Sequence, residues 1–256
     1  MTLYLVGDTA YAVLLASVRL VAWLVIAPPF NSRTVPMTVK VVLGFSLACA
    51  AAPILAESTL PTDLAGMLGT VVAQVVVGAA MGFLTSVLFA AVTAAGAIVD
   101  LLGGFSIAQA FDPMSSSTTT VIGHLHQMIA VLLLFASGGH LVVIGGLMRS
   151  FELLPVGALP DLEGLPDILS HAISLLFVTA VQIALPLAAV LFLADLGLAL
   201  MTKIAPQLNA LNVMFPAKVG LTLLLVGLSF ATLPWAVDRA VELTMQATAA
   251  FTGGSG

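Results

Sequence analysis

The sequence predicts an all-α, polytopic integral membrane protein, and three observations carry this prediction. Hydrophobic residues make up 61% of the 256 residues, and charged residues only 7%. A soluble domain averages about 25% charged residues. The mean hydropathy is +1.19. The apolar residues also gather in runs close to the roughly 20 residues that a helix needs to cross a hydrocarbon core.

Six apolar regions follow one another along the chain. They are residues 10–27, 39–55, 64–99, 121–148, 172–194 and 219–236. The third would be about 54 Å long as a helix, at about 1.5 Å per residue. No Pro, Asn or charge marks a turn within it, so we expect one long or bent helix there. The connections are too short for a soluble domain, which predicts a single membrane domain over residues 1–256 with a short C-terminal tail at 237–256.

Composition and residue spacing exclude several classes of protein. The net charge of −5 gives no basic surface for nucleic acid. The single Cys49 excludes an intrachain disulfide. His124 and His126 would face opposite sides of a helix, and no Cys or carboxylate completes a ligand set with them. We therefore expect no metal and no cofactor.

Two glycine motifs predict close helix packing. Gly78-x-x-x-Gly82 leaves a smooth face that lets another helix approach. The second motif is Gly139 with His140.

Gly139 and His140 follow Ser137-Gly138, which raises the question of an intramembrane serine protease. Such a protease needs the pattern G-x-S-G, and Phe135 stands in the place of its first glycine. We expect instead a helix break at Gly138-Gly139, with His140 satisfying a helix end.

A charge inside a span is a candidate functional residue, because burying it in lipid is costly. Arg19 lies in the middle of the first apolar region. Two interpretations stay open. Arg19 acts in gating or coupling, or it has a structural role, either snorkelling to the interface or pairing with a carboxylate of a neighbouring helix.

A polar junction separates the last two apolar regions. It contains Pro206, Gln207 and Asn209, and Pro216 follows it. Pro removes a backbone donor, and amide side chains in an apolar setting must find hydrogen-bond partners. We expect these residues to fix the hairpin between the two regions.

The segment at residues 103–117 is too apolar for a solvated loop, yet it contains turn signals and a run of Ser and Thr. Non-helical backbone at membrane depth persists only when it is buried in protein or lines a cavity. The segment therefore folds into the lumen of a channel as a plug, or it lies compactly on the membrane surface. Its candidate plug residues are Gly103, Gly104, Phe105, Phe111, Asp112, Pro113 and Met114.

Different short motifs follow one another along residues 10–236. They are Arg33-Thr-Val-Pro36 with Lys40, Gly78-Ala-Ala-Met-Gly-Phe83, Ala95-Gly96 with Asp100, Gly104-Phe-Ser106, Asp112-Pro113, Phe135 with Gly139-His140, Ser150-Phe151 ahead of Pro155-x-Gly157, Ala184-Leu-Pro186, Ala205-Pro-Gln-Leu-Asn209 and Phe215-Pro216. Each piece alone is weakly specific. The ordered set resembles the FliR/SctT family of type III secretion export gate proteins.

This resemblance implies a structural subunit of the export gate in the bacterial inner membrane, and not an enzyme. It implies FliP-like and FliQ-like gate subunits and FlhB-like and FlhA-like export proteins as partners, with unfolded export substrates passing through the channel and lipid around it. It also implies that residues 103–117 are the plug. The chain departs from the family pattern at Leu102-Gly103, at Lys203 and at Gly138.

Flagellar use is favoured over virulence use, because the Ala-Pro-Gln-Leu-Asn and Gly-His neighbourhoods are closer to the flagellar branch. The alternatives are an injectisome gate subunit and, in a different class, a secondary transporter. The transporter hypothesis rests on helix breaks expected at Pro186 and at Gly138-Gly139.

Overall fold

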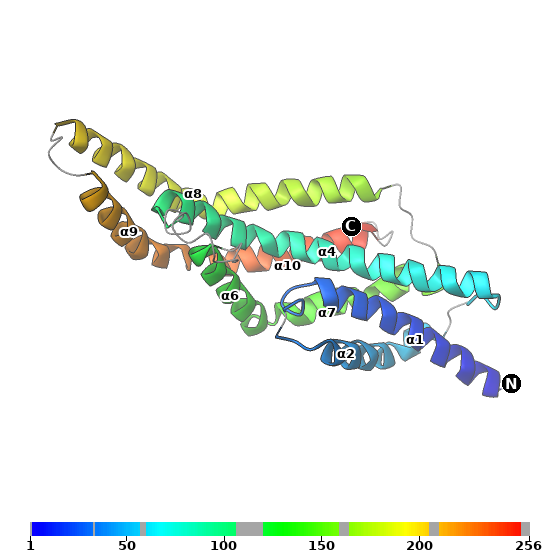
Figure 1. Cartoon of the computed structure of the whole chain (residues 1–256). Helices are drawn as coiled ribbons and strands as arrows, with labels where there is room; N and C mark the ends of the chain where they lie inside the picture. The colour runs from blue at the N-terminus through cyan, green and yellow to red at the C-terminus, as the bar shows by residue number, and fades with distance from the viewer. Residues whose placement is uncertain are drawn as a thin grey trace. The chain divides into compact units, whose positions relative to one another are not determined.

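The regular structure in the described part of the chain is entirely helical, which confirms the predicted class. The computed structural model describes residues 2–32, 34–56, 60–105, 120–158, 164–204 and 210–251. Its helices, labelled in Figure 1, are α1 (Thr2–Ile26), α2 (Met37–Ala50), α3 (Ala52–Leu55), α4 (Leu64–Gly103), α6 (Val121–Ala136), α7 (Gly139–Leu153), α8 (Leu165–Ile204), α9 (Ala210–Ser229) and α10 (Leu233–Phe251).

Three of these helices are long and apolar enough to cross a membrane by themselves. They are α1, from Thr9 onward, together with α4 and α8. The pairs α6 with α7 and α9 with α10 raise the number to five if each bent pair is counted as one span. The chain is therefore a polytopic membrane protein, as its composition predicts.

The third apolar region forms one helix, as expected. Helix α4 runs for 40 residues without interruption. The helix continues through Thr85, a polar residue in its interior. The Thr85 hydroxyl donates to the carbonyl oxygen of Met81 at 2.9 Å within the same helix. Gly104 follows with φ +84, a left-handed conformation that glycine adopts without strain, and this ends the helix.

The break expected at Pro186 is wrong, whereas the one at Gly138 is present. Helix α8 continues through Pro186 for 40 residues. A membrane helix tolerates Pro where neighbouring groups satisfy the freed backbone. Gly138 lies between α6 and α7 with φ +75, and the helical path ends there. Residues 237–251 of the expected tail belong to α10.

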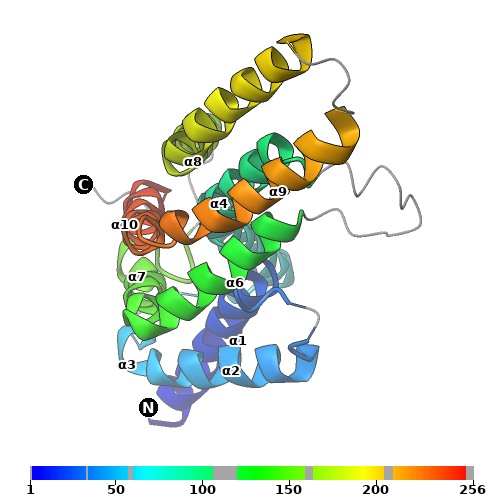
Figure 2. The same cartoon turned by 90° about the vertical axis from the view of Figure 1, so that its left-hand side faces the viewer.

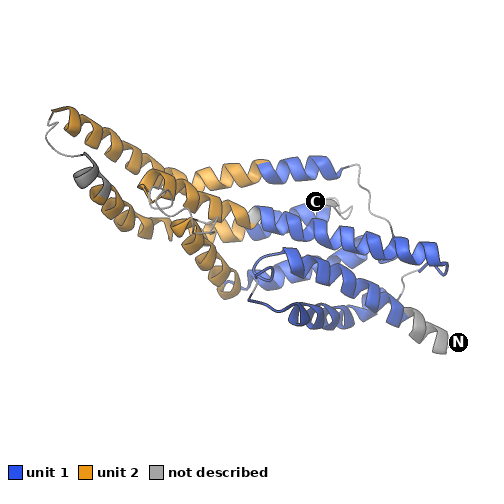
Figure 3. Ribbon diagram, in the orientation of Figure 1, with its two compact units in different colours: residues 1–88, 137–173, 240–256 blue, residues 89–136, 174–239 orange. Residues whose placement is uncertain are grey.

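Two compact units divide the chain (Figure 3). The first comprises residues 1–88, 137–173 and 240–256. Within it α1 and α2 lie side by side, as Figures 1 and 2 both show. Gly44 of α2 allows this approach, since a Cβ there would lie 2.6 Å from Cγ2 of Val21. The large, fully buried apolar side chains of this unit are Leu15, Leu20, Leu24, Leu55, Met81, Leu84 and Leu147.

The second unit comprises residues 89–136 and 174–239. It contains the C-terminal part of α4, α6, most of α8, α9 and the start of α10. Its buried apolar side chains come from every one of these helices and include Val99, Ile122, Leu134, Ile183, Leu191, Leu225 and Leu233. Large apolar side chains also remain exposed along the lipid-length helices, which is expected of surfaces that meet lipid or other helices.

Candidate functional site

Arg19 is the most deeply buried charge described in the first unit, with 0% of its surface exposed. Its Nε donates to Oε1 of Gln74 on α4 at 2.8 Å. Its Nη1 donates to the carbonyl oxygen and the Oγ of Ser150, both at 3.2 Å, and Nη2 donates to the carbonyl oxygen of Leu154 at 3.0 Å. The guanidinium also lies 4.5 Å from the ring centroid of Phe151. These partners are an amide, a hydroxyl, two carbonyls and an aromatic ring.

The carboxylate partner that the sequence suggested for Arg19 is therefore not among these contacts. The side chain does not snorkel either, because it is fully enclosed. Gln74 is also 0% exposed, and its Nε2 donates to the carbonyl oxygen of Val156 at 2.7 Å. Sequence reasoning missed Gln74 and Ser150 as partners, although a Gln inside a long apolar run signals a required hydrogen bond.

The predicted packing glycines of α4 both face α1. A Cβ on Gly78 would collide with the backbone carbonyl oxygen of Arg19 and lie 2.9 Å from Cβ of Ala22. A Cβ on Gly82 would lie 3.0 Å from Cβ of Ile26 and 3.1 Å from the carbonyl oxygen of Trp23. The two helices are thus in backbone contact along this seam.

The structure describes only the beginning of the predicted plug. Gly103 and Gly104 are buried and Phe105 is half-buried. A Cβ on Gly103 would lie 2.7 Å from Cγ2 of Thr222 on α9. The amide of Phe105 donates to the carbonyl oxygen of Asp100 at 3.1 Å. The other candidate plug residues, Phe111, Asp112, Pro113 and Met114, lie outside the described residues.

Asp100 of α4 connects the two sides of this segment. Its Oδ2 accepts the backbone N–H of Ile122 at 2.8 Å and that of Gly123 at 3.2 Å, and 1% of its surface is exposed. These are first-turn amides of α6, which have no partner within their own helix. A Cβ on Gly96 would lie 2.5 Å from the Cα of Gly123, so α4 and α6 are in backbone contact here. Asp100 caps a helix that begins 21 residues later in the chain.

The two histidines of α6 differ in burial. His126 is fully buried and its Nε2 lies 2.8 Å from Oγ of Ser229. The hydroxyl of Ser229 donates to the carbonyl oxygen of Val226 at 2.6 Å, so Ser229 joins α6 to its own helix α9. His124 is exposed, and the two rings therefore face different sides of α6. Among the described residues no group of three or more His, Cys, Asp or Glu is placed to hold a metal ion.

Gly139 and His140 lie at the start of α7, directly after the break. Gly139 is buried, and its N–H donates to Oγ of Ser137 at 3.3 Å. The amide of Leu141 donates to the carbonyl oxygen of Gly138 at 2.9 Å. His140 is half-buried. The hydroxyl of Ser137 thus serves the turn into α7, which is a structural use of the residue.

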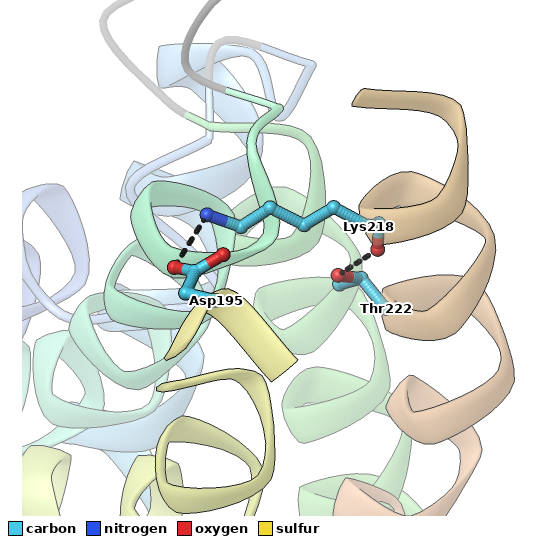
Figure 4. A network of polar contacts seen from close by, with 3 residues as sticks. All are labelled: Asp195, Lys218 and Thr222. Carbon is cyan, nitrogen blue, oxygen red and sulfur yellow. Dashed lines mark hydrogen bonds and ion pairs between the residues drawn. The ribbon is translucent and has the colours of Figure 1, made fainter. Parts of the chain in front are cut away.

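The predicted junction lies mostly outside the described residues, which include neither Pro206, Gln207 nor Asn209. Pro216 lies within α9, near its start. The described ends of the hairpin are joined by an ion pair between Nζ of Lys218 and Oδ2 of Asp195, at 2.8 Å (Figure 4). The carbonyl oxygen of Lys218 also accepts the hydroxyl of Thr222 at 2.8 Å. Asp195 lies on α8 and Lys218 on α9, so the ion pair links these two helices.

Removing one member of this ion pair should cost more than removing both. K218M leaves the Asp195 carboxylate without its partner, and D195L leaves the Lys218 ammonium without its partner. An unpaired charge on an apolar helix costs free energy. The double variant leaves neither charge. We expect each single variant to lower the thermal midpoint of the purified complex, and the double variant to recover most of the loss. Losses in the double variant that equal the sum of the two single losses would show that the pair is not coupled.

The chain matches a family of bacterial proteins and is similar to several named relatives. The model of the family described as bacterial export proteins, family 1, matches residues 10–244. Flagellar biosynthetic protein FliR of Escherichia coli (strain K12) is 35% identical over 208 residues, which cover 80% of each chain. Flagellar biosynthetic protein FliR of Bacillus subtilis (strain 168) is 28% identical over 93% of each chain. Yop proteins translocation protein T of Yersinia pestis is 30% identical over 60% of this chain and 59% of its own.

Proposed function

We propose a function from one premise: the chain belongs to the bacterial export proteins, family 1, because that family's model matches most of its length. It is a structural subunit of the type III secretion export gate and forms part of the membrane channel for unfolded proteins. The family match carries this conclusion. The long apolar helices support it, because a channel subunit must be embedded in a membrane.

The exported proteins are proposed to be those of the flagellum. The relatives named FliR match a larger share of this chain than does the relative named Yop proteins translocation protein T. A virulence injectisome is the alternative within the same class.

We propose that the subunit assembles with FliP-like and FliQ-like subunits, with FlhB-like and FlhA-like proteins nearby, in the bacterial inner membrane at the flagellar basal body. The exposed apolar side chains support contact with lipid and partner helices. On α8 alone these include Phe177, Leu185, Leu193, Leu200 and Ile204, each more than half exposed. Such a surface is too apolar to face water as a monomer.

A non-enzymatic role is proposed for the same chain. The buried polar side chains Arg19, Asp100 and His126 each bond to helix ends or to side chains on other helices. Their arrangement supports helix packing rather than a reaction. Residues 103–117 are proposed as the plug of the channel. The contact between Asp100 and the start of α6 joins the residues on either side of that segment.

Expression with and without FliP-like and FliQ-like partners tests the proposal. We expect a stable, monodisperse particle only in the presence of the partners, and loss of flagellar secretion when the gene is deleted. A monodisperse monomer that is unaffected by the partners would contradict the proposal. Solute uptake by the isolated protein in lipid vesicles would favour a secondary transporter instead.

A further inference from the structure

We infer that Arg19 and Gln74 form a backbone clamp that holds the end of α7 and the segment after it, residues 154–158, against α1 and α4. This role of Arg19 is independent of the export function. It is a structural role, distinct from gating and from ion pairing. The clamp is defined by hydrogen bonds to main-chain oxygens of the first unit, at Ser150, Leu154 and Val156.

The end of α7 needs hydrogen-bond donors from outside the helix. The last carbonyl groups of a helix find no amide donor within that helix and need donors from elsewhere. At Leu154 the backbone turns to φ −130 and ψ 87, which ends the helical path. The guanidinium of Arg19 donates to the carbonyl of Leu154, the residue that follows α7, and is a second donor to the carbonyl of Ser150, which already accepts the amide of Leu154. Arg19 therefore caps α7 from another helix.

The positive charge of Arg19 suits its position at the end of α7. The C-terminal end of a helix carries a partial negative charge, which favours a cation in its last turn. The Phe151 ring adds an attractive face at 4.5 Å. The helix end, the Gln74 amide and this ring together surround the guanidinium with electronegative groups. These neighbours explain how Arg19 is buried without a carboxylate in its hydrogen-bond shell.

Gln74 extends the clamp by one peptide group. Its Oε1 accepts from Arg19, so its other terminal atom must be the NH₂ group, which donates to Val156. Val156 is 0% exposed and lies in non-helical backbone, whose carbonyl has no helical partner. Arg19 and Gln74 thus supply donors to the carbonyls of Leu154 and Val156, which lie beyond the end of α7, and Arg19 adds a second donor to the carbonyl of Ser150.

The clamp requires the planar fork of arginine rather than its charge alone. Three nitrogens of Arg19 reach three residues in fixed directions. A lysine ammonium is a single point donor on a flexible chain and cannot span them. The charge-conserving variant R19K therefore separates the clamp from a role in gating, coupling or ion pairing, in which the charge itself is what matters.

Hydrogen exchange of the purified complex tests the inference at two amides. The amide of Leu154 donates to the carbonyl of Ser150 at 2.9 Å, and the amide of Ala158 donates to that of Pro155 at 3.0 Å. In R19K and R19M we expect exchange at both amides to rise at least about tenfold, because lost bonds from a charged donor open the segment locally. The variant R149M, which alters an exposed arginine beside Ser150, should leave both amides at the parent rate.

Q74E keeps the inference testable if the Arg19 variants fail to fold. It retains an oxygen for Arg19 but removes the donor to Val156. We expect faster exchange at Ala158 and little change at Leu154. Parent-like exchange at both amides in R19K, or parent-like exchange at Ala158 in Q74E, would overturn the clamp.

Discussion

Replacing Gly78 by leucine should prevent the first unit from forming its native packing. A Cβ at Gly78 would collide with the carbonyl oxygen of Arg19, which is main chain and cannot rotate away. It would also lie 2.9 Å from Cβ of Ala22. Relieving the contact requires α1 and α4 to separate, and that separation breaks the bond from Arg19 to Gln74. Overpacking of a core typically costs about 1–3 kcal/mol, and we expect a loss at or above the upper end of that range.

The measurements for Gly78→Leu are the yield and thermal midpoint of the purified complex, together with secretion in cells. Gly69→Leu is the matched control, because Gly69 is an exposed residue of the same helix and a Cβ there would meet no atom within 4 Å. The same leucine at residue 69 should leave yield and midpoint close to the parent. Equal behaviour of the two variants would contradict the close contact of α1 and α4.

Long apolar runs made the helices predictable, because the backbone in a membrane has few alternatives to the helix. Helix α4 illustrates this, since residues 64–99 lack any turn signal and form one helix. Helix α8 shows the limit of the same reasoning. Pro186 is a helix breaker in water, but the surrounding apolar sequence keeps α8 continuous through it. A local propensity gave way to the demand that backbone groups remain satisfied in an apolar setting.

Glycine spacing predicted where helices approach, but not which helices meet. Gly78 and Gly82 share one face of α4 by their spacing, and the structure shows that this face meets α1. The sequence could not identify the partners of Arg19 for a different reason. Two of the four oxygens that Arg19 bonds are main-chain oxygens, at Ser150 and Leu154, and every residue type has such an oxygen, so no side-chain pattern marks them.

Asp100 was recognised only as part of a motif, although two signals in the sequence bear on its role. An acidic residue ends one apolar run, and Thr120 precedes the next as a typical helix-capping residue. The structure shows that both act at the start of α6, where Thr120 Oγ1 accepts the amide of Gly123 at 3.2 Å. The distance in sequence between Asp100 and α6 hid the connection, because capping is ordinarily sought within one helix.

Replacing Asp100 by leucine should destabilise the start of α6 more than replacing it by asparagine. Leucine leaves the buried amide of Ile122 without an acceptor and removes one of two acceptors from Gly123. A stranded buried donor costs about 1–3 kcal/mol. Asparagine keeps an oxygen for these amides and loses mainly the attraction between a carboxylate and the helix N-terminus, at about 0.3–1 kcal/mol in an exposed setting and up to about 2 where partly buried.

The thermal midpoint of the purified complex should therefore fall in the order parent, D100N and D100L. Asp63→Leu is a control of the same chemistry, because Asp63 is exposed, accepts the amide of Gly66 at 2.9 Å, and caps the start of its own helix. The loss of stability in Asp63→Leu should be smaller, since water can replace the carboxylate there.

Conductance across cells that express the assembled gate tests the plug separately. Because Asp100 joins the residues on either side of residues 103–117, D100L gates that still assemble should leak ions. A smaller loss in D100L than in Asp63→Leu would contradict the role of Asp100 as the cap, and a tight D100L gate would contradict the plug.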